Sequence, residues 1–308
     1  MMQWPTVILL TVFLLISNSG CGPSGTSLTA EQLKEKYPDK KYVQVGEVWL
    51  HYEQEGLGKP AVFLHGLPTD SSIWRNIVPG LTYGNTIYCL DLMGSGFSEK
   101  PQNKTYSIDT QVELLGKFLD GFHLENPVIG GHGVGAAIAA VYAVRNPHKV
   151  RKLILMDAPL FPGYSTPGLG LLRFPLIGGM LTNDWFLTRT LRGGVKDPKA
   201  MPDVLVATYL APYKEDPGAR VALLKQVKEF NLDPILEKEV IPSLAKLQFP
   251  ILVVWGDGDP YVPLSIGRKI DDAMPDNQFR VILRTGFYNI EERPEEVRAV
   301  VKEFMDQD

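Results

Sequence analysis

Cysteine and histidine are scarce in this sequence, and neither sign of charge dominates. Two cysteines in 308 residues cannot form the disulfide framework of a small secreted domain. A net charge of −4, without a long basic run, argues against a surface for nucleic acids or anionic membranes. Five histidines are present and none follows His148, so no histidine can act as a base in the carboxyl-terminal part of the chain.

Long apolar runs are also missing, apart from residues 7–16, which are too few for an ordinary transmembrane helix. Small residues follow this run, and the layout is typical of an export signal. Cys21 resembles the lipidated cysteine of bacterial lipoproteins, although Asn18 stands where those signals usually carry leucine and no Lys or Arg precedes the run. We expect residues 1–21 to be an export signal, with the protein lipid-anchored through Cys21 at a bacterial cell membrane, or else periplasmic or secreted. An uncleaved amino-terminal anchor is the alternative.

The rest of the chain alternates apolar runs with amphipathic stretches, and its 44% hydrophobic content can bury one large core. The runs are too continuous for a half-exposed sheet, which indicates parallel strands covered on both faces. We predict an α/β fold with an eight-stranded, mostly parallel sheet and helices on both faces. The expected strands are 42–45, 48–53, 61–64, 86–90, 128–130, 150–156, 251–255 and 278–283. The expected helices lie near 73–77, 108–122, 136–145, 266–274 and 294–305.

One segment interrupts the alternation. Between about 161 and 247 no strong strand run appears, whereas proline, glycine and helical patches accumulate. We interpret this segment as a helical cap inserted over the carboxyl edge of the sheet, where open α/β sheets bind ligands. The expected divisions are a linker and short helix at 22–40, a core at 41–160 and 248–308, and the cap at 161–247.

A glycine-dense stretch at 128–137 has the layout of a nucleophile elbow, in which a strand breaks sharply into a helix and exposes one side chain. The pattern G-x-nucleophile-x-G reads GHGVG at 131–135. Gly133 therefore occupies the nucleophile position. Glycine adopts the positive φ of such an elbow without strain, so the turn is kept while the reactive group is absent.

Four further segments fit the same scheme: HGLPT at 65–69, DLMGSGFSEKP at 91–101, WGDGDP at 255–260 and GFYNIEERP at 286–294. With the elbow, in this order and spacing, they resemble a capped α/β-hydrolase over residues 41–304. The chain is most similar to the haloalkane dehalogenase and epoxide hydrolase branch, because the Pro-Thr pair at 68–69 is followed by WRNIVP at 74–79.

The resemblance implies a catalytic site with two of its three members substituted. Gly133 holds the nucleophile position and Phe287 the base position, and only Asp259, at the acid position, keeps a catalytic residue type. Asp157, which ends its strand, is a possible substitute acid. His132 is expected to pack or hydrogen-bond behind the turn.

The oxyanion hole of this family uses backbone N–H groups, which survive any side-chain change. Here they would be those of Leu67, after His65 and Gly66, and of Val134. Leu67 and Val134 also replace the halide-binding side chains of dehalogenases, which disfavours dehalogenation. No metal or cofactor is expected.

Three interpretations remain open at this point. The first is an exported pseudoenzyme that binds a small apolar or carbonyl or carboxylate ligand in a capped pocket, or a protein partner. The second is a hydrolase acting on an ester, epoxide or related substrate by a non-standard mechanism, with Asp259 or Asp91 positioning water and Tyr209 or Tyr213 of the cap donating a proton. The third, an engineered or misread sequence, is disfavoured by the double substitution.

Overall fold

The central sheet of the computed structural model contains seven strands in the order β1-β2-β4-β5-β6-β7, with β3 paired to β2. The structure describes residues 25–164, 168–174, 177–274 and 277–307. All pairs are parallel except that of β1 with β2. The strands are β1 (Lys41–Val45), β2 (Val48–Leu64), β3 (Tyr83–Leu90), β4 (Val128–His132), β5 (Lys152–Met156), β6 (Ile251–Gly256) and β7 (Gln278–Ile282).

The count of seven differs from the expected eight because two expected strands join in β2. Tyr52 pairs with Leu90 and Leu64 also pairs with Leu90, so β2 passes β3 twice, with register shifts between the two limbs. Gly56 and Gly58, both with positive φ, carry the chain from one limb to the other. Counted as two limbs, β2 gives the predicted α/β sheet its eight strand segments.

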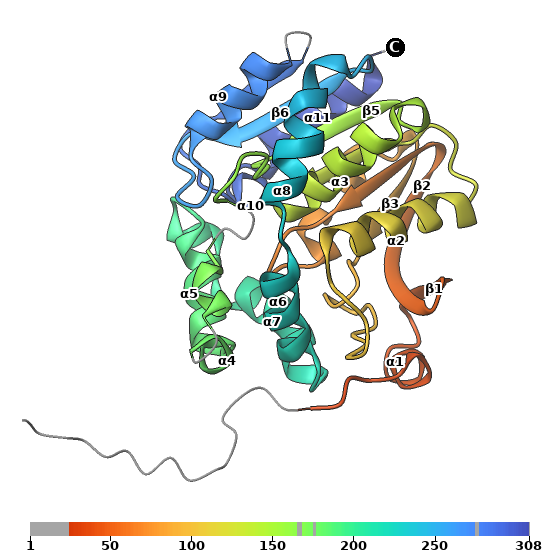
Figure 1. Ribbon diagram of the computed structural model, residues 1–308, viewed down its shortest axis with the longest axis vertical. Helices are drawn as coiled ribbons and strands as arrows, with labels where there is room; N and C mark the ends of the chain where they lie inside the picture. The colour runs from red at the N-terminus through yellow and green to blue at the C-terminus, as the bar shows by residue number, and fades with distance from the viewer. Residues whose placement is uncertain (1–24, 165–167, 175–176, 275–276, 308) are drawn as a thin grey trace, which may run out of the picture.

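Helices cover both faces of this sheet (Figure 1), as predicted. They are α2 (Ile108–Gly121), α3 (Val134–Arg145), α9 (Leu264–Ala273), α10 (Asn289–Glu292) and α11 (Pro294–Asp306). The predicted helix at 73–77 is instead a short 3-10 turn, η1 (Ser71–Trp74), followed by η2 (Val78–Gly80). Proline at 79 removes a backbone donor, which prevents a longer α-helix here.

Helical segments occupy the chain between β5 and β6, and Figure 1 shows α4–α7 gathered at one end of the sheet. We call this region the cap. Its elements are η4 (Gly170–Arg173), α4 (Gly178–Leu181), α5 (Asp184–Gly193), η5 (Pro198–Ala200), α6 (Asp203–Glu215) and α7 (Ala219–Glu229). After these come α8 (Asp233–Ile235), the π-helical η6 (Leu236–Val240) and η7 (Ile241–Lys246). A further short turn, η3 (Pro147–Lys149), precedes β5.

The amino-terminal helix α1 (Ala30–Lys36) begins with a capping box. The N–H of Gln32 donates to Thr29 Oγ1, and the Gln32 side chain accepts from the Thr29 N–H. The expected export signal and its Cys21 lie outside the described residues. Within the described part of the chain, no helix is long and apolar enough to cross a membrane. Cys89 is a buried free thiol, as expected.

Candidate functional site

The glycine-dense turn forms a tight junction between β4 and α3. Gly133 has a φ of +56° and a ψ of −124°, and its N–H donates to Met156 O at 2.9 Å. A Cβ at Gly131 would lie 2.4 Å from Ala136 N, and one at Gly135 would lie 2.4 Å from His65 O. Backbone thus occupies the space of both side chains, so this junction requires glycine at 131 and 135 as well as at 133.

The residue at the base position fills the space in front of the nucleophile position. A Cβ built on Gly133 would lie 2.8 Å from Cζ of Phe287, closer than a side-chain carbon can approach. Any side chain at position 133 would therefore point at the Phe287 ring. A nucleophile and its base would meet at this point in a working triad, whereas here glycine and phenylalanine pack together.

Aromatic contacts and the cap hold Phe287 in place. Its side chain is 1% exposed, and its ring centroid lies 4.5 Å from that of His132 and 5.6 Å from that of Tyr261. The following N–H, of Tyr288, donates to Gly194 O in the cap at 3.2 Å. The ring is thus fixed from both the core and the cap.

His132 packs behind the turn. Its Nε2–H donates to Phe287 O at 2.8 Å, and burial lowers the pKa of His132 to about 4. The ring is neutral at physiological pH, and Nδ1 is buried without a partner among the described residues. His132 therefore positions the backbone of Phe287 and does not face the nucleophile position as a base.

The two expected oxyanion donors are the backbone N–H groups of Leu67 and Val134. Neither the Leu67 nor the Val134 N–H has an acceptor in the described part of the chain. His65 fixes the first turn, because its Nδ1–H donates to Gly66 O at 2.8 Å while its Nε2 accepts from Leu92 N at 3.1 Å. Leu67 and Val134 are 6% and 2% exposed, so both donors are enclosed.

Asp259 lies at the expected acid position but has no base to orient. Its Oδ1 accepts from the N–H groups of Tyr261 and Val262 at 2.7 and 3.0 Å, whereas its Oδ2 is buried without a hydrogen-bond donor among the described residues. Burial raises the pKa of Asp259 to about 7, although those two N–H groups oppose the shift.

Asp157 interacts with Asp259 through its own carboxyl group. Asp157 Oδ1 accepts from Gly256 N at 3.0 Å, and Oδ2 accepts from Asn289 Nδ2. Burial and then the charge of Asp259 raise the pKa of Asp157 well above its usual value. Because two adjacent buried carboxylates repel each other, the pair retains a proton near neutral pH. The sequence suggested Asp157 only as a substitute acid and did not reveal this pairing.

The cap tyrosines tie the cap to the core. The Tyr209 hydroxyl donates to Glu291, which also forms a two-pronged ion pair with Arg75 at 2.8 and 2.7 Å. The Tyr213 hydroxyl donates to Pro68 O at 3.1 Å. Both tyrosines are buried, and their burial raises the pKa of each hydroxyl. These contacts support packing roles rather than proton donation.

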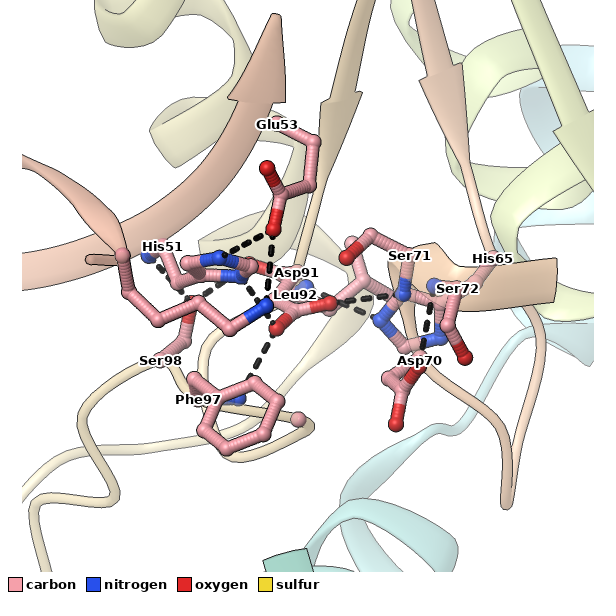
Figure 2. Close-up of polar contacts among 12 residues, drawn as sticks. His51, Glu53, His65, Asp70, Ser71, Ser72, Asp91, Leu92, Phe97 and Ser98 are labelled. Carbon is pink, nitrogen blue, oxygen red and sulfur yellow. Dashed lines mark hydrogen bonds and ion pairs between the residues drawn. The ribbon is translucent and has the colours of Figure 1, made fainter. Parts of the chain in front are cut away.

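Asp91 belongs to a different polar cluster, shown in Figure 2. Its Oδ1 accepts from Ser71 N at 2.7 Å, and its Oδ2 accepts from Phe97 N at 2.8 Å and from His51 Nδ1 at 2.7 Å. His51 Nε2 also contacts Glu53 at 3.2 Å. Both oxygens of Asp91 are thus committed to structure, which disfavours Asp91 as the residue that positions water.

His51 is buried although it lies on the β1–β2 hairpin. The first limb of β2 runs beside the end of β3, so His51 is 1% exposed and lies against Asp91. Burial disfavours the charged ring, but the charge and hydrogen bond of Asp91, with Glu53, outweigh it and raise the pKa of His51 to about 9. A buried His51–Asp91 ion pair results.

Comparison with known proteins decides the family. The model of the α/β hydrolase fold matches residues 59–294. The chain belongs to the α/β-hydrolase fold family. This α/β hydrolase has none of the His, Cys, Asp and Glu groupings that could hold a metal ion, within the described residues.

Relatives place this α/β hydrolase close to the dehalogenase branch. It is 28% identical to cis-3-alkyl-4-alkyloxetan-2-one decarboxylase of Shewanella oneidensis, covering 83% of this chain and 85% of the relative. It is 25% identical to haloalkane dehalogenase 2 of Mycobacterium bovis, over 82% and 90% of the two chains. The solved haloalkane dehalogenase of Bradyrhizobium elkani matches with a TM-score of 0.77 at 23% identity, over 86% and 97%. Because the named activities differ, they do not define a reaction here.

The contact between Gly133 and Phe287 predicts energetic coupling. Gly133→Ala adds backbone strain of about 1–3 kcal/mol and a clash with the ring, and Phe287→Ala costs about 3–5 kcal/mol as a buried aromatic truncation. In the double variant the clash is relieved, so its loss of stability should be smaller than the sum by at least about 0.5 kcal/mol. Urea unfolding of the four proteins measures this coupling. Gly121→Ala, whose Cβ meets nothing within 4 Å, is the control and should be additive with Phe287→Ala.

Asp259 should reduce stability when it ionises. Folding raises the pKa of this carboxyl from about 4 in the unfolded chain to about 7. The protein therefore loses stability as pH rises from about 4 to about 7. Asp259→Asn keeps an oxygen acceptor for Tyr261 and Val262 but cannot ionise. It should match the wild type near pH 4 and exceed its stability above pH 7, as measured by thermal unfolding across pH. Lower stability than wild type at pH 8 would contradict this account.

The His51–Asp91 ion pair also predicts a loss of stability with rising pH, but in a higher pH range. With a folded pKa of about 9 and an unfolded value of about 6.5, His51 adds stability that is full below pH 6.5 and is lost as pH rises through 9. The loss should be on the order of 3 kcal/mol. Urea unfolding between pH 6 and 10 should therefore show that His51→Gln is less stable than wild type at pH 6 and that the difference narrows towards pH 10. A constant difference would exclude the proposed ionisation.

Proposed function

We propose that this α/β hydrolase is an exported pseudoenzyme that binds a carbonyl or carboxylate ligand instead of cleaving it. The packing of the Phe287 ring against Gly133 carries the proposal. A site without a nucleophile or a base loses the acceleration that depends on the triad, leaving the oxyanion hole and binding effects. The attachment of the protein to a membrane through a lipid on Cys21, outside the described residues, is part of this proposal.

The unpaired amides support a binding role. Buried N–H groups without acceptors cost about 1–3 kcal/mol each, so an oxygen placed between Leu67 and Val134 would gain two hydrogen bonds. The amino end of α3 adds a favourable helix dipole for an anion. Since both donors are enclosed and Phe287 lies in front of the elbow, entry of a ligand requires the ring or the cap to move.

One observation favours a second candidate function, a hydrolase that works through Asp259. A carboxyl with a pKa of about 7 is suited to general acid or base catalysis near neutral pH. However, Asp259 accepts two backbone hydrogen bonds and is buried beside Asp157. These contacts explain its raised pKa without a role in catalysis. In the pseudoenzyme proposal, the same carboxyl pair is what remains of a triad in which Phe287 has replaced the base.

Rebuilding the triad tests the proposed loss of function. Gly133→Ser with Phe287→His places a nucleophile at the elbow and a base beside Asp259, while removing the phenylalanine ring that would clash with a new Cβ. We expect a fluorophosphonate probe to label the double variant and to leave the wild type unlabelled, as read by mass spectrometry.

Two controls accompany this experiment. Gly133→Ser alone should stay unlabelled because no base lies beside it, and the rebuilt triad with Asp259→Ala should label at least about tenfold more slowly. Labelling of the wild type would contradict the pseudoenzyme proposal. A folded double variant that resists the probe would contradict the assignment of Gly133 and Phe287 to nucleophile and base positions.

A further inference from the structure

The cap exposes large apolar side chains that the core does not use. Of the nine large hydrophobic residues that are most exposed in the described part of the chain, five lie between η4 and α5. They are Leu171 (52% exposed), Phe174 (56%), Ile177 (44%), Met180 (61%) and Trp185 (65%). We call this set the cap face. Contiguous exposed apolar surface of this kind marks an interaction site in a water-soluble fold.

The residues of the cap face lie close together. Phe174 N donates to Leu171 O and Gly178 N donates to Phe174 O, and η4 and α4 contact each other. Leu171 and Trp185 also line one open hollow of about 680 Å³. The cap face is therefore a single surface.

Charges around the cap face fit the headgroup region of a lipid bilayer. Arg189 lies 5.8 Å from the Trp185 ring and pairs with no carboxylate in the described part of the chain. The other two arginines between 168 and 192 have partners within the protein, since Arg173 donates to Val227 O and Phe230 O and Arg192 pairs with Asp203. Tryptophan with arginine beside aliphatic side chains is the composition of surfaces that lie in a membrane interface. Because the whole chain carries a net charge of −4, the attraction is mainly apolar.

The path of the chain brings this surface to the membrane. The described chain starts at Gly25, where a Cβ would lie 2.5 Å from Pro217, in the turn between α6 and α7. Lys36 and Tyr37 hydrogen-bond Glu215 beside that turn. α7 in turn contacts α4 and η4, and Figure 1 shows α4 at the same end of the molecule as the start of the described chain. Three residues lie between Cys21 and Gly25, so the two α-carbons are at most about 14 Å apart.

We propose that the cap face docks on a lipid bilayer, with Trp185 and its apolar neighbours in the interface. This inference rests on the membrane attachment in the proposed function, because an acylated Cys21 would hold the α6–α7 turn near the bilayer.

Fluorescence quenching by lipid tests this orientation in the full chain. The protein is reconstituted in phosphatidylcholine vesicles with plain or brominated acyl chains, and the Trp185 signal is the difference between wild type and Trp185→Phe. We expect this signal to lose most of its intensity in brominated vesicles. Trp185→Phe with Tyr83→Trp is the matched control, since Tyr83 is 91% exposed at the amino end of β3, outside the cap. Its new tryptophan should not be quenched.

Other outcomes overturn the inference in distinguishable ways. If the protein floats with the vesicles while Trp185 stays unquenched, the membrane attachment is supported and docking of the cap face is contradicted. If the protein does not float, both proposals are contradicted. Shielding of Trp185 that grows with protein concentration in the absence of lipid assigns the cap face to a second copy of the chain.

Discussion

The ring of Phe287 packs against the α-carbon of Gly133, and the arrangement of the surrounding site follows from this contact. The elbow leaves no room for a side chain at 133 because Cζ of Phe287 would lie 2.8 Å from its Cβ. His132 holds the Phe287 backbone from behind, and the cap holds the adjoining Tyr288 through Gly194. Because Phe287 has no ring nitrogen, it cannot donate a hydrogen bond to Asp259 Oδ2, which has no partner among the described residues. The Asp259 carboxyl is instead left beside that of Asp157, and burial raises the pKa of both groups.

The scaffold around this contact is a tight junction of backbone segments. The glycines at 131 and 135 allow the close approach of β4, α3 and the turn at His65, and the N–H groups of Leu67 and Val134 remain without acceptors in the described part of the chain. A change of side chain leaves backbone donors unchanged, which is why the proposed binding role requires neither a nucleophile nor a base. The cap is anchored to the core by the Tyr209, Glu291 and Arg75 contacts, whereas its outer surface is apolar and exposed.

The strands, the mostly parallel character of the sheet and most helices could be predicted from the sequence because apolar runs and glycine turns are local signals. The elbow at 131–135 and the acid loop at 255–260 were recognisable for the same reason. Contacts between distant segments were not. The pairing of Asp157 with Asp259 depends on β5 lying beside β6, and the burial of His51 depends on β2 passing β3 twice. No local pattern encodes either adjacency, and the short turn at η1 differs from the expected helix because Pro79 limits it.

Turnover by the unmodified protein tests the central claim most directly. Purified protein is incubated with activated esters, epoxides and haloalkanes, and each rate is compared with that of Asp259→Ala. The account predicts that wild type and variant do not differ, because Gly133 and Phe287 supply neither nucleophile nor base. Turnover that is present in the wild type and lost in Asp259→Ala would contradict it and would establish a hydrolase that acts through the buried carboxyl pair.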